Sequence, residues 1–179
     1  MQYSELLTFW FEEIDSSFWF KKDDDFDQGL IDRFLVLHQA AMANELFTWR
    51  TTIEGRLAEI ILLDQFSRNM FRDSAQAFAS DSLSLCLAQQ AVALNLDSEL
   101  DARQRSFLYM PYMHSESKII HQQAEKLFAA PGLEANYAFE LKHKTIIDEF
   151  GRYPHRNKLL GRQSTKAEIE FLKQSGSSF

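Results

Sequence analysis

Residues 56–72 read RLAEIILLDQFSRNMFR, and this stretch carries the clearest helical pattern of the chain. Three apolar side chains recur at the three- and four-residue spacing of one helix face, namely Leu57, Ile60 and Ile61. The helix is expected to open near Thr52. An amphipathic helix of this kind must bury its apolar face against other elements, so we expect it to lie in the core.

Asp64 continues the apolar face of that helix, and its carboxylate is therefore expected to point inward. A lone buried charge is costly, so Asp64 needs a partner. Arg68 and Arg72 are the nearest candidates in the sequence. Such a pair can simply tie a helix end to a loop, or it can belong to a functional site. The segment alone favours neither interpretation.

The rest of the chain repeats the helical spacing, and no run alternates polar and apolar residues as a half-buried strand would. Six glycines and three prolines in 179 residues are few for the frequent turns of an all-β fold. We expect an all-α fold of about seven or eight helices in stacked antiparallel hairpins, without a regular repeat. Residues 1–174 are expected to form one domain and residues 175–179 a flexible tail. The expected helices cover approximately residues 3–14, 26–44, 52–66, 81–95, 99–111, 115–130 and 133–150, with a short one from 165.

Composition excludes several classes of protein. A net charge of -7 argues against nucleic-acid binding, which needs a broad basic surface. The single cysteine, Cys86, rules out an internal disulfide, and its apolar surroundings predict an inert core thiol. No stretch approaches the length of a membrane span, and acids stand near the N-terminus where a signal peptide carries lysines. We therefore expect a cytoplasmic protein.

A second polar group follows Pro111, which is expected to end or kink its helix, in FLYMPYMHSES (residues 107–117). Ser115 could cap the next helix and Glu116 would suit its first turn, but this leaves His114 unexplained. His114 and Glu116 are also types that transfer protons or bind metals. His121, among glutamines and a lysine, is expected at the surface.

The densest cationic loop of the chain is FGRYPHRNKLLGR (residues 150–162). Gly151 suits a left-handed helix cap, and Tyr153-Pro154 forces a bend. Arginine is suited to bidentate recognition of carboxylate or phosphate. The loop could clamp internal acids such as Asp64 or Asp148, or it could line a pocket for an anionic ligand. From residue 151 to residue 167 there are five cations and no acid: Arg152, Arg156, Lys158, Arg162 and Lys166.

Signatures of known cofactor sites are missing from the sequence. It contains no glycine-rich phosphate loop, no H-E-x-x-H pattern and not the two Glu-x-x-His motifs that a di-iron bundle carries. No cofactor and no metal are therefore predicted. His143 lies on an apolar helix face, where a satisfied core histidine is the usual explanation.

Five blocks, in this order along the chain, resemble a bacterial family known only as domain of unknown function 924: FWF, LLDQFSRNMFR, AFASD, RSFLYMPYMHSES and FGRYPHRNKLLGRQST. The family pattern D-Q-F-x-R-N-x-F-R falls on residues 64–72, H-S-E on residues 114–116, and F-G-R-F-P-H-R-N on residues 150–157. Tyr153 stands in place of the second phenylalanine of the last pattern, which keeps the ring. The resemblance implies a tetratricopeptide-like all-α fold and brings no established activity.

The blocks that mark the family are mostly polar, whereas a scaffold that only had to fold would be marked by apolar periodicity. We expect the three polar segments to converge into one site for a small anionic ligand. Its expected acid–base residues are His114, Glu116 and His155. Its expected binding residues are Asp64, Gln65, Arg68, Asn69, Arg72, Arg152, Arg156, Asn157 and Arg162.

Two other functions compete with the anion site. A tetratricopeptide-like fold would suit a protein-interaction module whose arginines grip an acidic peptide. A metal-dependent enzyme could use His114, Glu116, His143 and His155, although their spacing is not diagnostic. The sequence does not indicate an oligomeric state.

Overall fold

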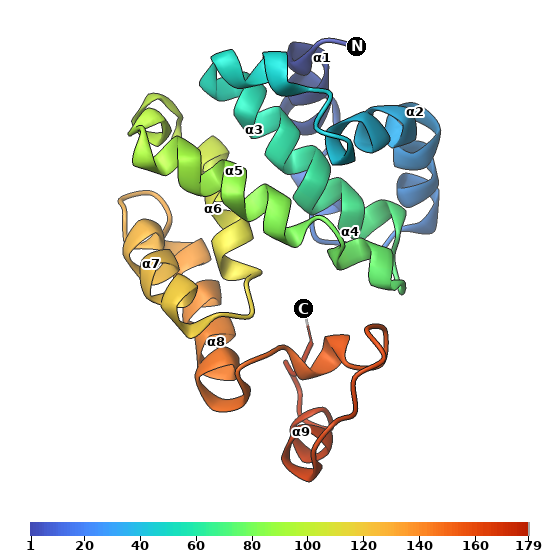
Figure 1. Cartoon of the computed structure of the whole chain (residues 1–179), viewed down its shortest axis with the longest axis vertical. Coiled ribbons are helices and arrows are strands. Elements are labelled where there is room, and N and C mark those ends of the chain that lie inside the picture. Colours follow the sequence, from blue (N-terminus) through green and yellow to red (C-terminus); the bar gives the residue numbers. More distant parts are fainter. Residues whose placement is uncertain (179) are drawn as a thin grey trace.

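The computed structural model describes residues 1–178 (Figure 1). No β-strand occurs within those residues, so the predicted all-helical fold is confirmed. None of the helices in this range has the length and hydropathy needed to cross a membrane. The α-helices are α1 (Tyr3–Thr8), α2 (Asp24–Met42), α3 (Ile53–Ile61), α4 (Ser67–Met70), α5 (Asp81–Ala93), α6 (Ala102–Met113), α7 (Lys118–Phe128), α8 (Glu134–Phe150) and α9 (Lys166–Phe171).

Helix α3 is the centre of the fold and packs against α1, α5 and α6. Thr52 caps it, as expected, because its side chain accepts a hydrogen bond from the Gly55 amide at 3.1 Å. A glycine is required at position 55, since a Cβ there would stand 2.0 Å from the carbonyl oxygen of Trp49. The close approach holds the 3-10 turn Phe47–Thr51 against the start of α3.

After α3 the chain stays helical, and a π-helical segment, Leu62–Phe66, connects α3 to α4. All five residues of this segment are buried. Such wider turns are frequent at functional sites. The polar side chains of Asp64 and Gln65 are thus carried into the interior by a segment that is otherwise apolar.

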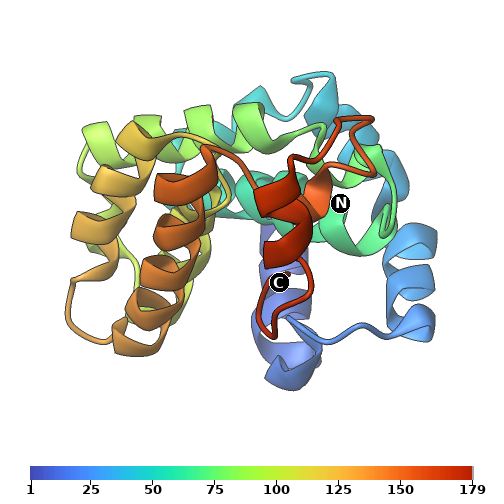
Figure 2. The ribbon, with the colours of Figure 1, turned by 90° about the horizontal axis from the view of Figure 1, so that it is seen from below.

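The helices that follow pack in chain order, α5 on α6, α6 on α7 and α7 on α8. Figure 2 shows the α7–α8 pair on one side, α2 on the other, and α9 between them. Gly151 ends α8 in the left-handed conformation with φ at 70°, as predicted. The tetratricopeptide-like arrangement implied by the resemblance stays a prediction.

Two expectations about burial are wrong. Cys86 is exposed, because α5 turns Ser84, Leu87, Ala88 and Ala91 toward the core and leaves position 86 outside. His121 is fully buried rather than at the surface. Nδ1 of its ring lies 2.7 Å from Oε1 of Glu140 on helix α8, and Nε2 lies 2.8 Å from the carbonyl oxygen of Ser115.

Two helix boundaries also differ from expectation. Helix α6 continues past Pro111 to Met113. The cap of α7 is Ser117 rather than Ser115, so Glu116 lies ahead of the helix instead of in its first turn. The predicted tail at residues 175–179 reaches residue 179, which lies outside the described residues; Ser177 is buried, and its hydroxyl donates to the Leu172 carbonyl at 3.2 Å.

Candidate functional site

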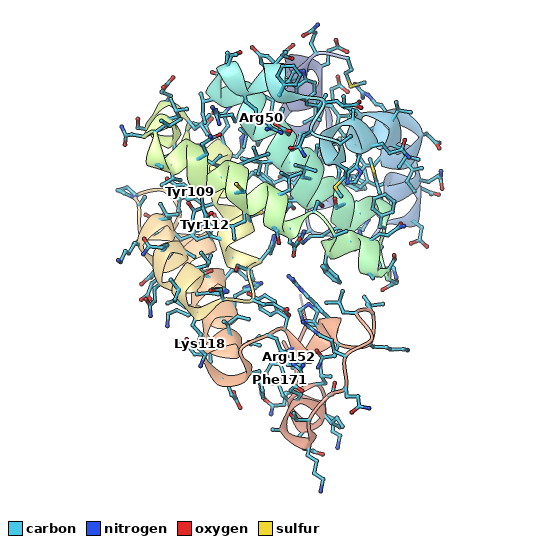
Figure 3. The ribbon with its side chains drawn as sticks, viewed as in Figure 1. Arg50, Tyr109, Tyr112, Lys118, Arg152 and Phe171 are labelled. Atoms are coloured by element: carbon cyan, nitrogen blue, oxygen red, sulfur yellow. The ribbon has the colours of Figure 1, made fainter. Side chains whose placement is uncertain are left out.

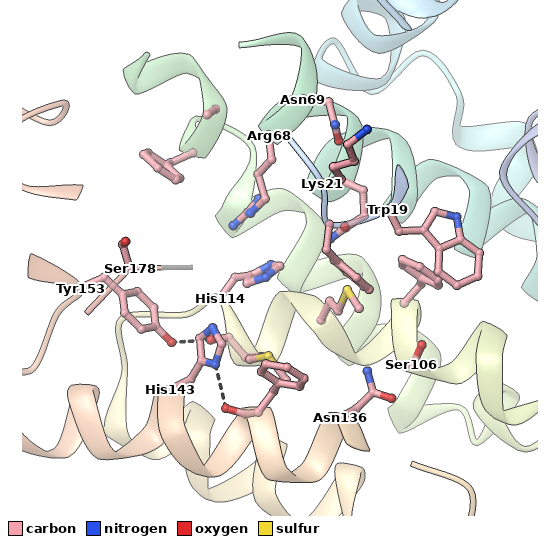
Figure 4. A pocket seen from close by; sticks show the side chains of 18 of the residues that line it. Trp19, Lys21, Arg68, Asn69, Ser106, His114, Asn136, His143, Tyr153 and Ser178 are labelled. Carbon is pink, nitrogen blue, oxygen red and sulfur yellow. Dashed lines mark hydrogen bonds between the residues drawn. The ribbon is translucent and has the colours of Figure 1, made fainter. Parts of the chain in front are cut away.

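A cavity of about 1120 Å³ brings the three predicted polar segments together. Arg68 reaches it from α4, His114 from the end of α6 and Arg156 from the loop after α8. Figure 4 shows Arg68 and His114 on one side of this space, with His143 and Tyr153 on the other. Residues that are far apart in the sequence therefore share one cavity.

The lining of the cavity is cationic although the protein is acidic. Asp73 is the one acidic residue among its described lining residues, and Arg103 is the one lining cation from α6. A concave surface dominated by one sign of charge concentrates ions of the opposite sign. The lining lysines and arginines are Lys21, Lys22, Arg68, Arg72, Arg103 and Arg156.

Asp64 lies immediately behind the cavity wall and is 1% exposed. One oxygen, Oδ1, lies 2.8 Å from Nδ1 of His114 and 3.0 Å from Nη1 of Arg68. The other, Oδ2, accepts a hydrogen bond from Nε2 of Gln65 at 2.5 Å. Burial alone would raise the pKa of Asp64, but Arg68 and His114 more than reverse this and hold it well below its usual range. Asp64 is therefore ionised at neutral pH.

His114 is held in one orientation by that carboxylate. An ionised Asp64 can only accept, so Nδ1 of His114 carries the proton and Nε2 keeps its lone pair. Burial, with Arg68 beside the ring, lowers the pKa of His114 against the opposing effect of Asp64. The imidazole is thus neutral at neutral pH, with its tautomer set by a buried partner.

Arg68 and Arg156 share a second carboxylate, Asp81, at the start of α5. Nη2 of Arg68 donates to Oδ2 of Asp81 at 3.2 Å, and Nη1 of Arg156 donates to the same oxygen at 3.0 Å. Nη1 of Arg68 also lies 3.0 Å from Oδ1 of Asp81, so two guanidinium groups share this single carboxylate. Asp81 was not predicted as a site residue, although it ends the AFASD block, because an acid at a helix N-terminus has an ordinary explanation.

Arg156 is the most deeply buried arginine of the lining, with 6% of its surface exposed. Its guanidinium carbon lies 4.5 Å from the ring centre of Phe78 and 4.6 Å from that of Tyr153. Rings on both faces leave only the edge of the guanidinium for hydrogen bonds. Within residues 1–178 no acceptor bonds to its buried Nε–H. Burial and the nearby Arg68 lower the pKa of Arg156.

Two further histidines line the cavity in neutral form. Burial lowers the pKa of His143 to about 3, and Nδ1 of this ring donates to the carbonyl of Phe139 at 2.8 Å. Burial and the adjacent Arg156 lower the pKa of His155 to about 4. At neutral pH the cavity is therefore lined by permanent cations and uncharged imidazoles.

Three predicted binding residues on the α4 side, Gln65, Asn69 and Arg72, also line the cavity. Arg72 donates to both oxygens of Asp27 on α2, at 2.6 and 3.0 Å, and Asn69 donates to Oδ1 at 2.7 Å. Asp27 was not predicted. It lies in the first turn of α2, where an acidic residue has an ordinary explanation.

Four other predicted residues do not line the cavity. Arg162 forms a bidentate pair with Glu116, at 2.6 and 2.8 Å, and its Nε donates to Oδ1 of Asn157. Arg152 forms a similar pair with Glu168 on α9, at 2.6 and 2.8 Å. In Figure 3, Arg152 lies beside Phe171, which belongs to α9. Arg152 and Arg162 therefore pair with acidic residues of the protein itself, which is the first of the two alternatives for the loop.

An apolar wall, also missed by the sequence analysis, completes the cavity. Trp19 and Phe20 come from the loop before α2, and their rings contact Phe107 of α6 at centroid distances of 4.9 and 6.3 Å. Met110 and Phe139 extend this wall toward α8. The signal in the sequence was the aromatic FWF at residues 18–20, in a segment without helical spacing.

The donors for a metal centre do not assemble. Across the part of the chain that the structure describes, no group of three or more His, Cys, Asp or Glu side chains is placed to hold a metal ion. His143 and His155 line the cavity, but Glu116 faces Arg162 instead. The geometry therefore offers arginines and neutral imidazoles rather than a ligand set.

Fold and site together define an all-helical domain with a cation-lined cavity. The chain belongs to the family described as "Bacterial protein of unknown function (DUF924)", whose model matches residues 6–176. It is similar to the solved structure of a protein of unknown function, ATU0120 from Agrobacterium tumefaciens, with 35% identity, 96% of each chain covered and a TM-score of 0.91. No curated protein matches the sequence.

Proposed function

We propose that the cavity binds a small anionic ligand, with Arg156 as its main contact and Arg68 and His114 beside it. The observation that carries this proposal is the buried Nε–H of Arg156, for which the described residues supply no acceptor. A buried donor without a partner costs free energy comparable to a lost hydrogen bond, and a small movement of the guanidinium toward a ligand oxygen would remove that cost.

The charge inventory supports an anion over a cation. Asp64 and Asp81 are balanced by Arg68 and Arg156, and the lining histidines are neutral. Further along the lining, Arg103 has no carboxylate partner among the described residues; its Nη1 donates to the backbone carbonyl of Phe11. The cavity therefore keeps unused cationic capacity, which a bound anion would engage.

Thermal unfolding with inorganic phosphate, sulfate, acetate or citrate tests the proposal. A ligand that binds only the native state raises its melting temperature, by an amount that grows with concentration. We expect at least one of these anions to stabilise the wild-type protein, and the effect to disappear in Arg156→Gln. Lys158→Gln removes the same charge from the same loop at an exposed position outside the lining and should behave as wild type. Equal stabilisation of R156Q and wild type would contradict the proposal.

One observation favours a second candidate, recognition of an acidic peptide. Ser178 lines the cavity, so extended backbone can reach this space. A peptide would present its carboxylates to the same arginines. In isothermal titration, an acidic peptide that binds more tightly than any of the small anions, with the same dependence on Arg156, would establish this candidate in place of the first.

A further inference from the structure

The cavity is much larger than a simple anion needs. Its volume of about 1120 Å³ lies at the upper end of pockets that hold drug-sized molecules, roughly 300–1,000 Å³. Phosphate or acetate beside Arg156 would leave most of that space unfilled. The remaining space is bounded largely by Trp19, Phe20 and Phe107, side chains that gain from contact with apolar matter rather than water.

The lining of the cavity changes from polar to apolar along helix α6. His114, at the C-terminal end of α6, marks the polar part beside Arg68. Met110 and Phe107 lie on the same face, one and two turns back. With a rise of 1.5 Å per residue, Phe107 stands about 10 Å from His114 along the helix axis. A ligand that fills the cavity must therefore change from polar to apolar over about that length.

The aromatic residues at this end include two that are unusually exposed. Phe20 is 70% exposed and Phe139 is 51% exposed, although both line the cavity. Phe20 lines the cavity from the loop before α2, and Phe139 lines it from helix α8. Large apolar side chains held at the rim of a cavity are typical of a binding surface for an apolar group.

The charge of the polar end limits the charge of the ligand. Asp64 and Asp81 offset Arg68 and Arg156, and His114 is neutral, so this buried cluster has no net charge. A monoanion there adds one negative charge, whereas a dianion adds two in a poorly solvated place. The free edge of Arg156 also suits one oxygen of a planar carboxylate.

We propose that the ligand is a monocarboxylate with an aliphatic or aromatic body, its carboxylate on Arg156 and its body along α6 toward Phe107. This inference rests on the proposed anion site and specifies the class of its ligand. Carboxylate recognition and apolar contact are separated in space, so each can be removed without the other.

Isothermal titration of the full chain with octanoate, acetate and 1-octanol tests the two parts. Octanoate should bind at least about 100-fold more tightly than acetate, because each buried methylene contributes a factor of roughly four. It should also bind at least about ten-fold more tightly than 1-octanol, which lacks the carboxylate. Benzoate and 3-phenylpropionate as further probes distinguish an aromatic body from an aliphatic one.

Variants assign the two ends of the ligand. R156Q should weaken octanoate binding about ten-fold or more. Phe139→Ala and Phe20→Ala should weaken octanoate binding but not acetate binding, whereas Phe47→Ala, an equally exposed phenylalanine outside the lining, should change neither. Lys158→Gln removes an exposed cation of the same loop that lies outside the lining and should leave octanoate affinity within about two-fold.

The possible failures can be told apart. If acetate binds in an Arg156-dependent way and octanoate binds no more tightly, the amphipathic ligand is wrong and the anion site stands. If octanoate and 1-octanol bind equally and R156Q has no effect, the anion site is wrong as well. An affinity that depends on Arg103 instead of Arg156 overturns the orientation proposed here, and no binding of any probe overturns both proposals.

Discussion

Arg152, Arg156 and Arg162 lie in one short loop, yet they have different environments. Arg152 and Arg162 each pair with both oxygens of one glutamate, at distances of 2.6–2.8 Å. Arg156 shares one oxygen of Asp81 with another arginine and lies between two aromatic rings. The outer two are satisfied by the protein itself, whereas the inner one keeps an unused donor.

Under the proposed function, this difference separates the arginines that stabilise the fold from the arginine that binds the ligand. A bidentate arginine–carboxylate pair ties two elements together and leaves little capacity for a ligand. Arg162 ties the loop to the α6–α7 connection through Glu116, and Arg152 ties it to α9 through Glu168. These two pairs hold the loop in the place from which Arg156 reaches the cavity. The loop is therefore rich in cations because two of its arginines hold it in place and the third lines the cavity.

The largest expected effect comes from the carboxylate behind the cavity. Asp64→Ala removes the more deeply buried of the two carboxylates that pair with Arg68 and leaves His114 without the acceptor that orients it. Breaking a buried pair in this way costs about 3–5 kcal/mol. Urea unfolding at pH 7 measures the loss, and Asp148→Ala, which removes an exposed partner of Lys144, serves as control at no more than about 1 kcal/mol. A loss below about 1 kcal/mol in D64A would show that this cluster does not stabilise the fold.

Replacing Arg162 and Arg156 one at a time tests whether the two arginines differ in function. Arg162→Gln removes a half-buried bidentate pair and should lower the free energy of unfolding by about 2 kcal/mol. It should leave the affinity for an anion that binds at Arg156 within about two-fold. R156Q should show the opposite pattern, with loss of binding and a smaller loss of stability, because Asp81 keeps Arg68. Similar effects of both variants on both measurements would remove the distinction.

Much of the fold follows from sequence spacing. The apolar face of α3 and the inward position of Asp64 follow from the helical period, and the left-handed cap follows from Gly151. The π-helical segment has no comparable signal, because widening a helix by one residue changes no residue type. Cys86 was misplaced since α5 is apolar on more than one face, and only packing against α3 and α6 selects the buried one.

The candidate site was predictable in its residue types but not in its pairings. Asp81 stands 75 residues before Arg156, so the contact depends on tertiary packing that no local pattern contains. His121 shows the same limit: polar neighbours in the sequence indicate a surface, but Glu140 on α8 provides a buried partner. Which arginines serve the fold and which face the cavity likewise depends on where their carboxylates lie.

The smallest expected effect concerns the outer pair of Arg152 and Glu168, and it depends on pH. Arg152 lowers the pKa of Glu168 to about 2, from an ordinary value of 4.5. A carboxylate with a lowered pKa in the native state stabilises the protein above its unfolded pKa, and this contribution is lost as the pH falls toward the native pKa. Arg152→Gln should therefore be less stable than wild type at pH 7, by less than Arg162→Gln, and the difference should shrink between pH 4.5 and pH 2. Urea midpoints measured across this range test it, because a difference that persisted at the acid end would mean that Arg152 acts through packing instead of its charge.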